Sequence, residues 1–143
     1  MVPLLTNAHY VVDELPERAV RVTRLGRLFS SEAEVNEACE PVQAVLDQLG
    51  RGSYVLLLDS RFARGSNDPD YERWFTTQRA RMPRGFKRAA LLMKTAIGAL
   101  HSDRLRRADG ANDELQIFQD LPAACAYLGI GIPPELPEEL TGT

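Results

Sequence analysis

Residues 54–75 read YVLLLDSRFARGSNDPDYERWF, and this stretch decides how the rest of the chain is interpreted. The apolar run that ends at Asp59 has the length of a strand and no polar alternation, which predicts a central strand covered on both faces. A loop rich in Ser, Arg, Gly and Asn follows. Asp68 then fits the N-cap of a helix, and Pro69 fits its first position. Because loops in this position often hold functional residues, the sequence raises the question of what this loop does.

Upstream of this stretch, the sequence predicts a hairpin and a helix. Residues 10–24 alternate with a period of two on either side of the turn ELPE, and the period continues as far as Arg24. Residues 31–49 are apolar at helical spacing and end at Gly50. Pro41 lies within them and should kink or split the helix, because proline removes a backbone donor.

Downstream, strands and helices continue to alternate. Strands are predicted over residues 89–93 and 114–120, a helix over 96–108, and a second helix between Asp120 and Leu128. The inward side of the first of these helices is expected to hold its apolar residues: Ile97, Leu100, Leu105 and Ala108. This order predicts an α/β fold with a mixed, mostly parallel sheet, an N-terminal hairpin and about four helices.

Length and composition indicate a single domain. The chain has 143 residues, 44% of them hydrophobic, with no apolar run long enough for a membrane span and no signal-peptide pattern. We assign residues 1–130 to the domain and residues 131–143 to a proline-rich acidic tail, extended or mobile. Cys39 and Cys125 both fall in helical patterns and are interpreted as buried small side chains. The expected compartment is the cytoplasm.

The charge is distributed unevenly along the chain. The span from Arg61 to Arg107 holds twelve of the seventeen basic residues and four acids, a net charge of +8 against −11 elsewhere. This asymmetry favours either a polar partner for one face or mutual neutralisation of the two parts. The overall pI is about 5.4 and no nucleic-acid-reading motif is present, so no nucleic-acid partner is expected.

No motif in the sequence specifies a reaction. The loop lacks the glycine patterns of phosphate-binding loops, and neither a nucleophile elbow nor a metal-ligand spacing occurs. We therefore expect no enzymatic activity, cofactor or metal. An enzyme would need a polar cleft in which His9 or His101 meets the loop at Ser60, Ser66 or Asp68.

The order of these segments resembles the STAS-like superfamily, in particular the STAS/Sec14-like group related to anti-sigma-factor antagonists. The resemblance covers residues 8–130 and is carried by VVDELPERAVRVTRLGRL, the acidic helix over 31–49, residues 54–75, KRAALLMKTAIGAL and LQIFQDLPAACAYLGI. It implies a non-catalytic module that works by partner switching. In such antagonists, the loop after the central strand docks on a kinase-like regulatory protein, and phosphorylation of a serine in that loop abolishes docking.

The loop departs from the antagonist pattern at the phosphorylated position. Antagonists carry an Asp-Ser-Ser-Gly or Asp-Ser-Thr-Gly type sequence where this chain has residues 66–69, SNDP. Ser66 and Ser60 remain as candidate phosphorylation sites. Regulated binding without phosphorylation is the alternative that the departure leaves open.

We expect the loop and the helix after it to form the contact surface for a protein partner. The contact residues are predicted to be Arg61, Arg64, Ser66, Asn67, Asp68, Tyr71 and Arg73. Homodimerisation is plausible, whereas stable membrane insertion is not expected. The Sec14-like side of the resemblance implies an alternative, a pocket for a lipid or another small molecule. Against it, a domain of this size should have little apolar lining to spare once its sheet is covered.

Overall fold

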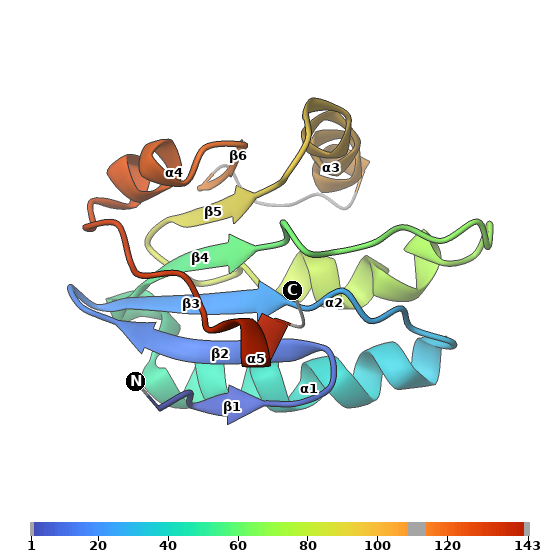
Figure 1. Ribbon diagram of the computed structural model, residues 1–143, viewed down its shortest axis with the longest axis horizontal. Helices are drawn as coiled ribbons and strands as arrows, with labels where there is room; N and C mark the ends of the chain where they lie inside the picture. Colours follow the sequence, from blue (N-terminus) through green and yellow to red (C-terminus); the bar gives the residue numbers. More distant parts are fainter. Residues whose placement is uncertain (1, 109–113, 142–143) are drawn as a thin grey trace.

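Six strands form one sheet, and their spatial order is their order in the sequence (Figure 1). The computed structural model describes residues 2–108 and 114–141. The strands are β1 (Leu5–Thr6), β2 (Tyr10–Leu15), β3 (Ala19–Arg24), β4 (Val55–Asp59), β5 (Ala89–Leu92) and β6 (Leu115–Phe118). The first three are antiparallel, and β3 to β6 run parallel. The predicted hairpin and mostly parallel sheet are confirmed, and β1 is an addition to the prediction.

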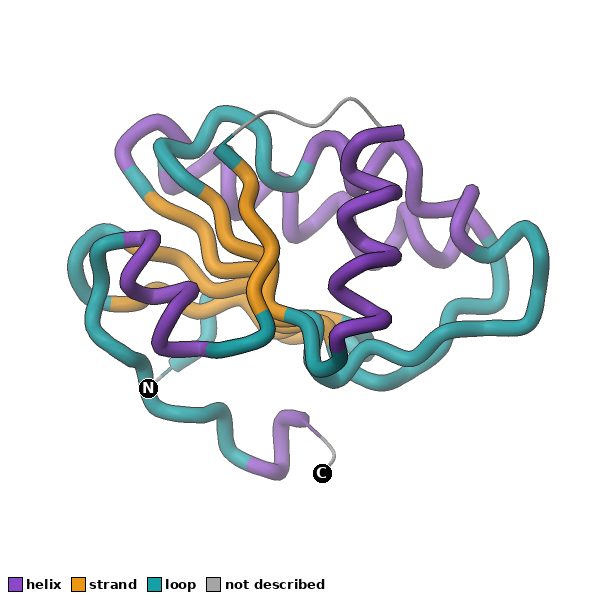
Figure 2. Tube along the Cα trace, turned by 90° about the horizontal axis from the view of Figure 1, so that it is seen from above, coloured by secondary structure: helices purple, strands orange, loops and turns teal. Residues whose placement is uncertain are grey.

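The helices lie on both faces of this sheet. They are α1 (Glu32–Leu49), α2 (Thr76–Arg81), α3 (Ala96–Ala108), α4 (Leu121–Leu128) and α5 (Glu138–Thr141), with 3-10 turns η1 (Arg51–Ser53) and η2 (Glu72–Phe75). Figure 2 shows α1, α2 and α3 on one side, and α4 on the other side with the tail. Right-handed crossovers between successive parallel neighbours explain why the first three helices share a side.

Strand β4 separates two hydrophobic cores. Leu56 faces the core under α1 and α2, whereas its neighbour Leu57 faces the core under α4, and neither side chain is exposed. Because successive side chains of a strand point to opposite faces, a strand buried on both faces needs the continuous apolar run that β4 has. The predicted central strand is confirmed.

Two local predictions differ from the structure. Helix α1 continues through Pro41 without being split, because its buried side holds it against the sheet while Pro41 lies on the exposed side. The helix predicted to start at Asp68 starts later. The Asp68 carboxylate accepts a hydrogen bond from the backbone N–H of Asp70 at 2.9 Å, which stabilises a turn, and helical structure begins with η2.

The tail crosses the face that α4 covers (Figure 2). It has no regular structure between α4 and α5, and the carbonyl of Pro134 accepts a hydrogen bond of 2.8 Å from the guanidinium of Arg21. Leu136 is buried against the domain. Residues 142 and 143 of the predicted tail lie outside the described residues.

Candidate functional site

A cavity of about 540 Å³ lies between the sheet, α2 and α3. Its apolar wall includes Val22 of β3, Leu58 of β4 and Leu91 of β5, and Phe75 and Met82 contribute from the helical side. The site is next to the carboxyl ends of three parallel strands, where α/β proteins commonly bind ligands. A volume of this size is in the range of small-molecule sites. The expectation that the domain has little apolar lining to spare is therefore wrong.

The cavity exists because α3 stands away from the sheet. No residue of α3 is buried, and Ile97 and Leu100, which were expected to face inward, are 83% and 55% exposed. Leu105 is half-buried and lines the cavity. The N-terminus of α3 is fixed by the Thr95 hydroxyl, which accepts a hydrogen bond from the Gly98 N–H at 3.0 Å. The sequence predicted which residues of α3 are apolar but not the gap beneath the helix.

The loop after β4 forms one rim of the cavity, and Arg61 fixes its position. The Arg61 guanidinium binds both carboxylate oxygens of Asp59 at 3.0 and 2.7 Å, and both of Glu135 in the tail at 3.1 and 2.9 Å. The hydrogen bonds to Asp59 raise the pKa of Arg61, and those to Glu135 add to the effect. Ser60 and Arg64 of the same loop line the cavity. The predicted contact loop is thus also part of a pocket.

The structure exposes most of the predicted contact residues. Five of them are exposed: Arg64, Ser66, Asn67, Asp68 and Arg73. Arg61 is partly buried in its two ion pairs. Tyr71 has to be removed from the set because it is only 2% exposed and packs on Trp74 and Phe75. Of the two candidate phosphorylation sites, Ser66 is exposed, whereas Ser60 is half-buried in the cavity lining.

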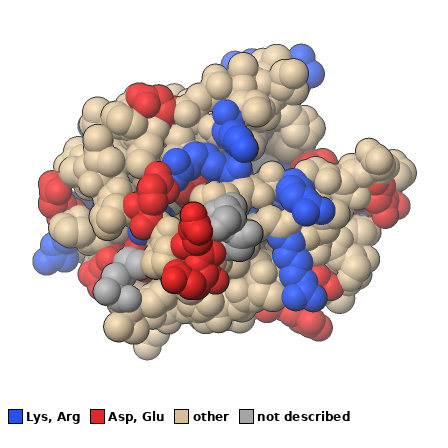
Figure 3. Space-filling model, viewed as in Figure 1, with Lys and Arg blue, Asp and Glu red and all other residues tan. Residues whose placement is uncertain are grey.

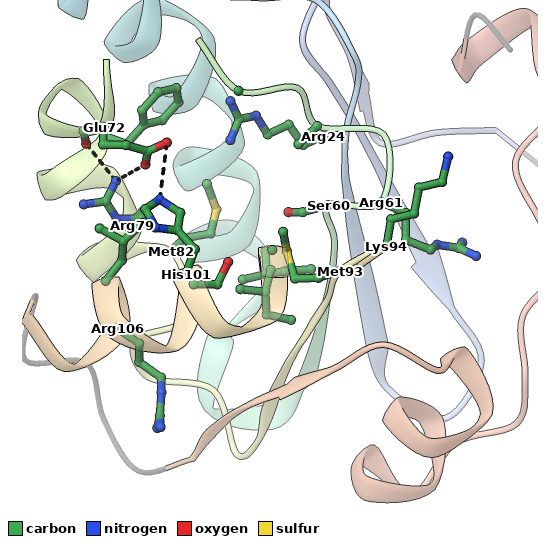
Figure 4. Close-up of a pocket in the computed structure, with 18 of the residues that line it drawn as sticks. Arg24, Ser60, Arg61, Glu72, Arg79, Met82, Met93, Lys94, His101 and Arg106 are labelled. Carbon is green, nitrogen blue, oxygen red and sulfur yellow. Dashed lines mark hydrogen bonds and ion pairs between the residues drawn. The ribbon is translucent and has the colours of Figure 1, made fainter. Parts of the chain in front are cut away.

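Charged groups on the cavity lining are mostly basic. Six Arg or Lys residues and one acid, Glu72, contribute to it. Glu72 is engaged by Arg79, whose guanidinium lies 3.4 Å from its carboxylate, and by His101 at 3.9 Å. In Figure 4 these three side chains lie together at one end of the cavity, while Arg61 and Lys94 point away from it.

Arg24 differs from the other basic residues of the lining. It follows Val20 and Val22 on the face of β3 that carries the larger core, so a cation occupies an inward position. Its Nε atom is buried and has no hydrogen-bond partner, and its Nη2 donates a long bond of 3.4 Å to the Tyr71 hydroxyl. The period of two reached Arg24 in the sequence, which was the available signal for this residue.

The histidines do not complete a catalytic arrangement with the loop. The His9 ring stacks on Phe29 with centroids 3.9 Å apart, and its Nε2 lies 3.1 Å from Glu34 at the start of α1. His101 lines the same cavity as Ser60, but its imidazole faces Glu72. Among the described residues, no hydrogen bond joins either imidazole to Ser60, Ser66 or Asp68.

Residues 2–108 and 114–141 contain no group of three His, Cys, Asp or Glu side chains placed to hold a metal ion. Within the same residues, no helix combines the length and the apolar character needed to cross a bilayer. Both cysteines are buried, as expected.

The uneven charge of the sequence is partly neutralised within the fold. Arg61 pairs with Glu135 and Arg81 pairs with Glu40, and each of these pairs joins the basic span to the acidic remainder. Figure 3 shows acidic side chains over α5 next to Lys and Arg side chains near the ends of β4 and β5. This supports the neutralisation interpretation for part of the surface.

Comparison with known proteins identifies the fold. No family model and no curated protein matches the chain. A solved structure from Shewanella loihica PV-4, described as an uncharacterized protein of the DUF3478 family with a SpoIIAA-like fold, superposes with a TM-score of 0.56. The sequences are 14% identical, and the match covers 87% of this chain and 98% of that chain. The chain therefore has the SpoIIAA-like fold, which is the fold of STAS domains and anti-sigma-factor antagonists. The resemblance inferred from its sequence is confirmed at the level of the fold.

Proposed function

We propose that this protein is a non-catalytic regulatory module that binds a small apolar ligand in the cavity between α2, α3 and the sheet. The observation that carries the proposal is the cavity itself, about 540 Å³ in volume and walled by apolar side chains of the sheet, of η2 and of α3. An empty apolar cavity forgoes packing contacts that its lining residues would otherwise make. A ligand that fills it restores these contacts and removes its own apolar surface from water.

The position of the cavity suggests how binding is communicated. Ser60 and Arg64 belong both to the cavity lining and to the loop after β4, and residues 65–69 of that loop are exposed. A ligand in the cavity contacts the inner side of the loop, so its presence can alter the outer side. This is the property that a ligand-dependent regulator needs.

The experiment compares two tryptophan substitutions in α3 by calorimetric titration with 1-octanol. Leu105→Trp fills the cavity from a lining position, whereas Leu100→Trp makes the same change at an exposed position outside the lining. We expect saturable binding by the wild type and by L100W, and at least about tenfold weaker binding by L105W. Absence of binding to the wild type, or equal binding by both variants, would contradict the proposal.

Partner binding through the loop after β4 is the second candidate function. The exposure of Arg64, Ser66, Asn67, Asp68 and Arg73 favours it, because these residues are free to contact a protein that recognises both charge and polar groups. Ser66 is the better of the two candidate phosphorylation sites. Its hydroxyl accepts a hydrogen bond from the Asp68 N–H, and a phosphate on it would add negative charge at the start of that turn.

Charge reversal tests this second candidate. Affinity capture from the host lysate is compared between the wild type, Arg64→Glu with Arg73→Glu, and a control with Arg104→Glu and Arg107→Glu on α3. All four substituted arginines are exposed. A partner that is lost only with the loop variant, with phosphate mapped to Ser66, supports a switch. If the loop variant captures the same proteins as the wild type, partner binding through this loop is contradicted.

A further inference from the structure

Arg24 places an arginine cation at the wall of an otherwise largely apolar cavity without a counter-ion. No aspartate or glutamate among the described residues lies within ion-pair distance of its guanidinium. The acid of the cavity lining, Glu72, is engaged by Arg79 and His101 instead. A half-buried cation with an unsatisfied donor is costly, and proteins commonly compensate such a group with an anion.

The groups around Arg24 do not supply that anion. Its guanidinium lies 4.6 Å from the ring centroid of Phe75 and 5.7 Å from that of Phe29, so aromatic faces support the charge on one side. The neighbouring Tyr10 and Cys39 stay neutral, because burial raises the pKa of both side chains. Figure 4 shows the side chain of Arg24 extending along the cavity from the side of Ser60, whose hydroxyl is a second polar group on this lining.

We infer that the ligand of this cavity is a single-chain anionic amphiphile, with its carboxylate or phosphate head bound by Arg24 and its apolar chain held between the sheet and α3. This inference rests on the proposed function and adds the chemical class of the ligand. The guanidinium offers two hydrogen-bond donors in the geometry that a carboxylate or phosphate oxygen pair accepts. The apolar wall formed by Leu58, Leu91 and Met93 then accommodates the chain.

The test is a calorimetric series on the full chain with probes that share one apolar chain. Octanoate and octyl phosphate carry an anionic head, 1-octanol a neutral one and octylammonium a cationic one. Wild type should bind the two anionic probes about ten- to hundredfold more tightly than 1-octanol, because hydrogen bonds to charged groups are stronger than neutral ones. Octylammonium should bind more weakly than 1-octanol. Equal affinity for octanoate and 1-octanol overturns the inference.

Matched arginine variants locate the head group. Arg24→Met should remove the preference for octanoate and leave the affinity for 1-octanol unchanged, whereas Arg27→Met, an exposed arginine three positions along the chain, should change neither. Arg24→Lys should retain part of the preference. If R24M does not fold, the comparison of R24K with the wild-type probe series still tests whether the cavity prefers an anionic head group. If a folded R24M binds neither octanoate nor 1-octanol, Arg24 acts by packing against its neighbours, and the inference is contradicted.

Two further arms separate the inference from the function beneath it. Acetate and inorganic phosphate should bind far more weakly than octanoate, because each methylene buried in the cavity contributes about fourfold in affinity. Equal affinities for phosphate and octyl phosphate would show that the site binds free anions, and would overturn the inference that the ligand is an amphiphile. If 1-octanol binds and L105W abolishes this without any anionic preference, the inference fails while the proposed function stands. If no probe binds, both fail.

Discussion

Two arginines of β3 show how the partner of a charge determines what the residue does. Arg21 and Arg24 lie three positions apart and therefore on opposite faces of the sheet. Arg21 is 2% exposed and binds the Asp13 carboxylate through two hydrogen bonds of 3.0 and 2.8 Å. The guanidinium of Arg24 lies over aromatic rings, but no carboxylate among the described residues forms an ion pair with it. The first arginine is a structural element, and the second is the one that we propose binds the ligand.

The Asp13–Arg21 pair gives the first prediction. Asp13→Asn leaves a buried guanidinium without its anion and should lower the free energy of unfolding by about 3–5 kcal/mol. Asp70→Asn removes an exposed ion pair with Arg73, in which the side chains of Asp70 and Arg73 are 51% and 71% exposed. This change should lower the free energy of unfolding by less than about 1 kcal/mol. Urea denaturation measures both. Similar losses in the two variants would show that burial of the pair is not what matters.

Tyr10 and Cys39 give a prediction about alkaline pH. Burial raises the pKa of Tyr10 above its usual 10.0 and that of Cys39 above its usual 9.0, so the folded state keeps protons that the unfolded state releases. Their contribution to stability is full below pH 9 and is lost as the pH rises through these values. A variant with Tyr10→Phe and Cys39→Ala should show a shallower decline of unfolding free energy between about pH 9 and 11. A decline identical to wild type contradicts this assignment.

At the scale of elements, α1 and α3 differ most in how they are attached. Six residues of α1 are buried, whereas α3 has none. Since local stability follows buried contacts, backbone amides of α3 should exchange with deuterium faster than those of α1. Octanoate should slow exchange in α3 and in the loop after β4 while leaving α1 unchanged. Equal protection of both helices without ligand would argue against a loosely held α3.

The tail is attached to the loop after β4 by the Arg61–Glu135 ion pair. The carboxylate of Glu135 is 58% exposed, so the pair should stabilise the protein only modestly. Glu135→Gln is expected to lower the free energy of unfolding by less than about 1 kcal/mol at low salt, and the difference from wild type should vanish at high salt. Glu139→Gln, an exposed change in α5, is the control. A salt-independent loss would show that Glu135 acts through packing instead.

Local patterns in the sequence were sufficient for β2 to β6, but not for β1 or for every helix. The apolar run of β4 and the alternation of β2 and β3 predict strands. A strand buried on one face has apolar residues at every second position, and a strand buried on both faces is apolar throughout. The start of η2 was misplaced because Asp68 hydrogen-bonds to Asp70 and forms a turn. The contact between Arg21 and Pro134 joins residues 113 positions apart, and no local pattern records it.

At the scale of the whole molecule, the loop was predictable as a site and the cavity was not. The loop follows from the end of β4, and most of its residues are exposed as expected. The cavity depends on the distance between α3 and the sheet, which is a tertiary property. Apolar residues at helical spacing predicted that Ile97 and Leu100 would pack inward. Both are exposed instead, and of the two Ile97 borders the cavity while Leu100 does not. Arg24 could have been noticed, because a cation interrupts an inward-facing apolar series.

The central claim, that the cavity receives a ligand, is tested most directly by the methyl groups of two methionines. Met82 and Met93 both line the cavity, and the chain has only three methionines. In a protein labelled with ¹³C at the methionine methyl groups, a titration with octanoate should shift the signals of Met82 and Met93 saturably, and L105W should abolish the shifts while L100W preserves them. Signals of Met82 and Met93 that do not move at saturating octanoate and 1-octanol would contradict the account.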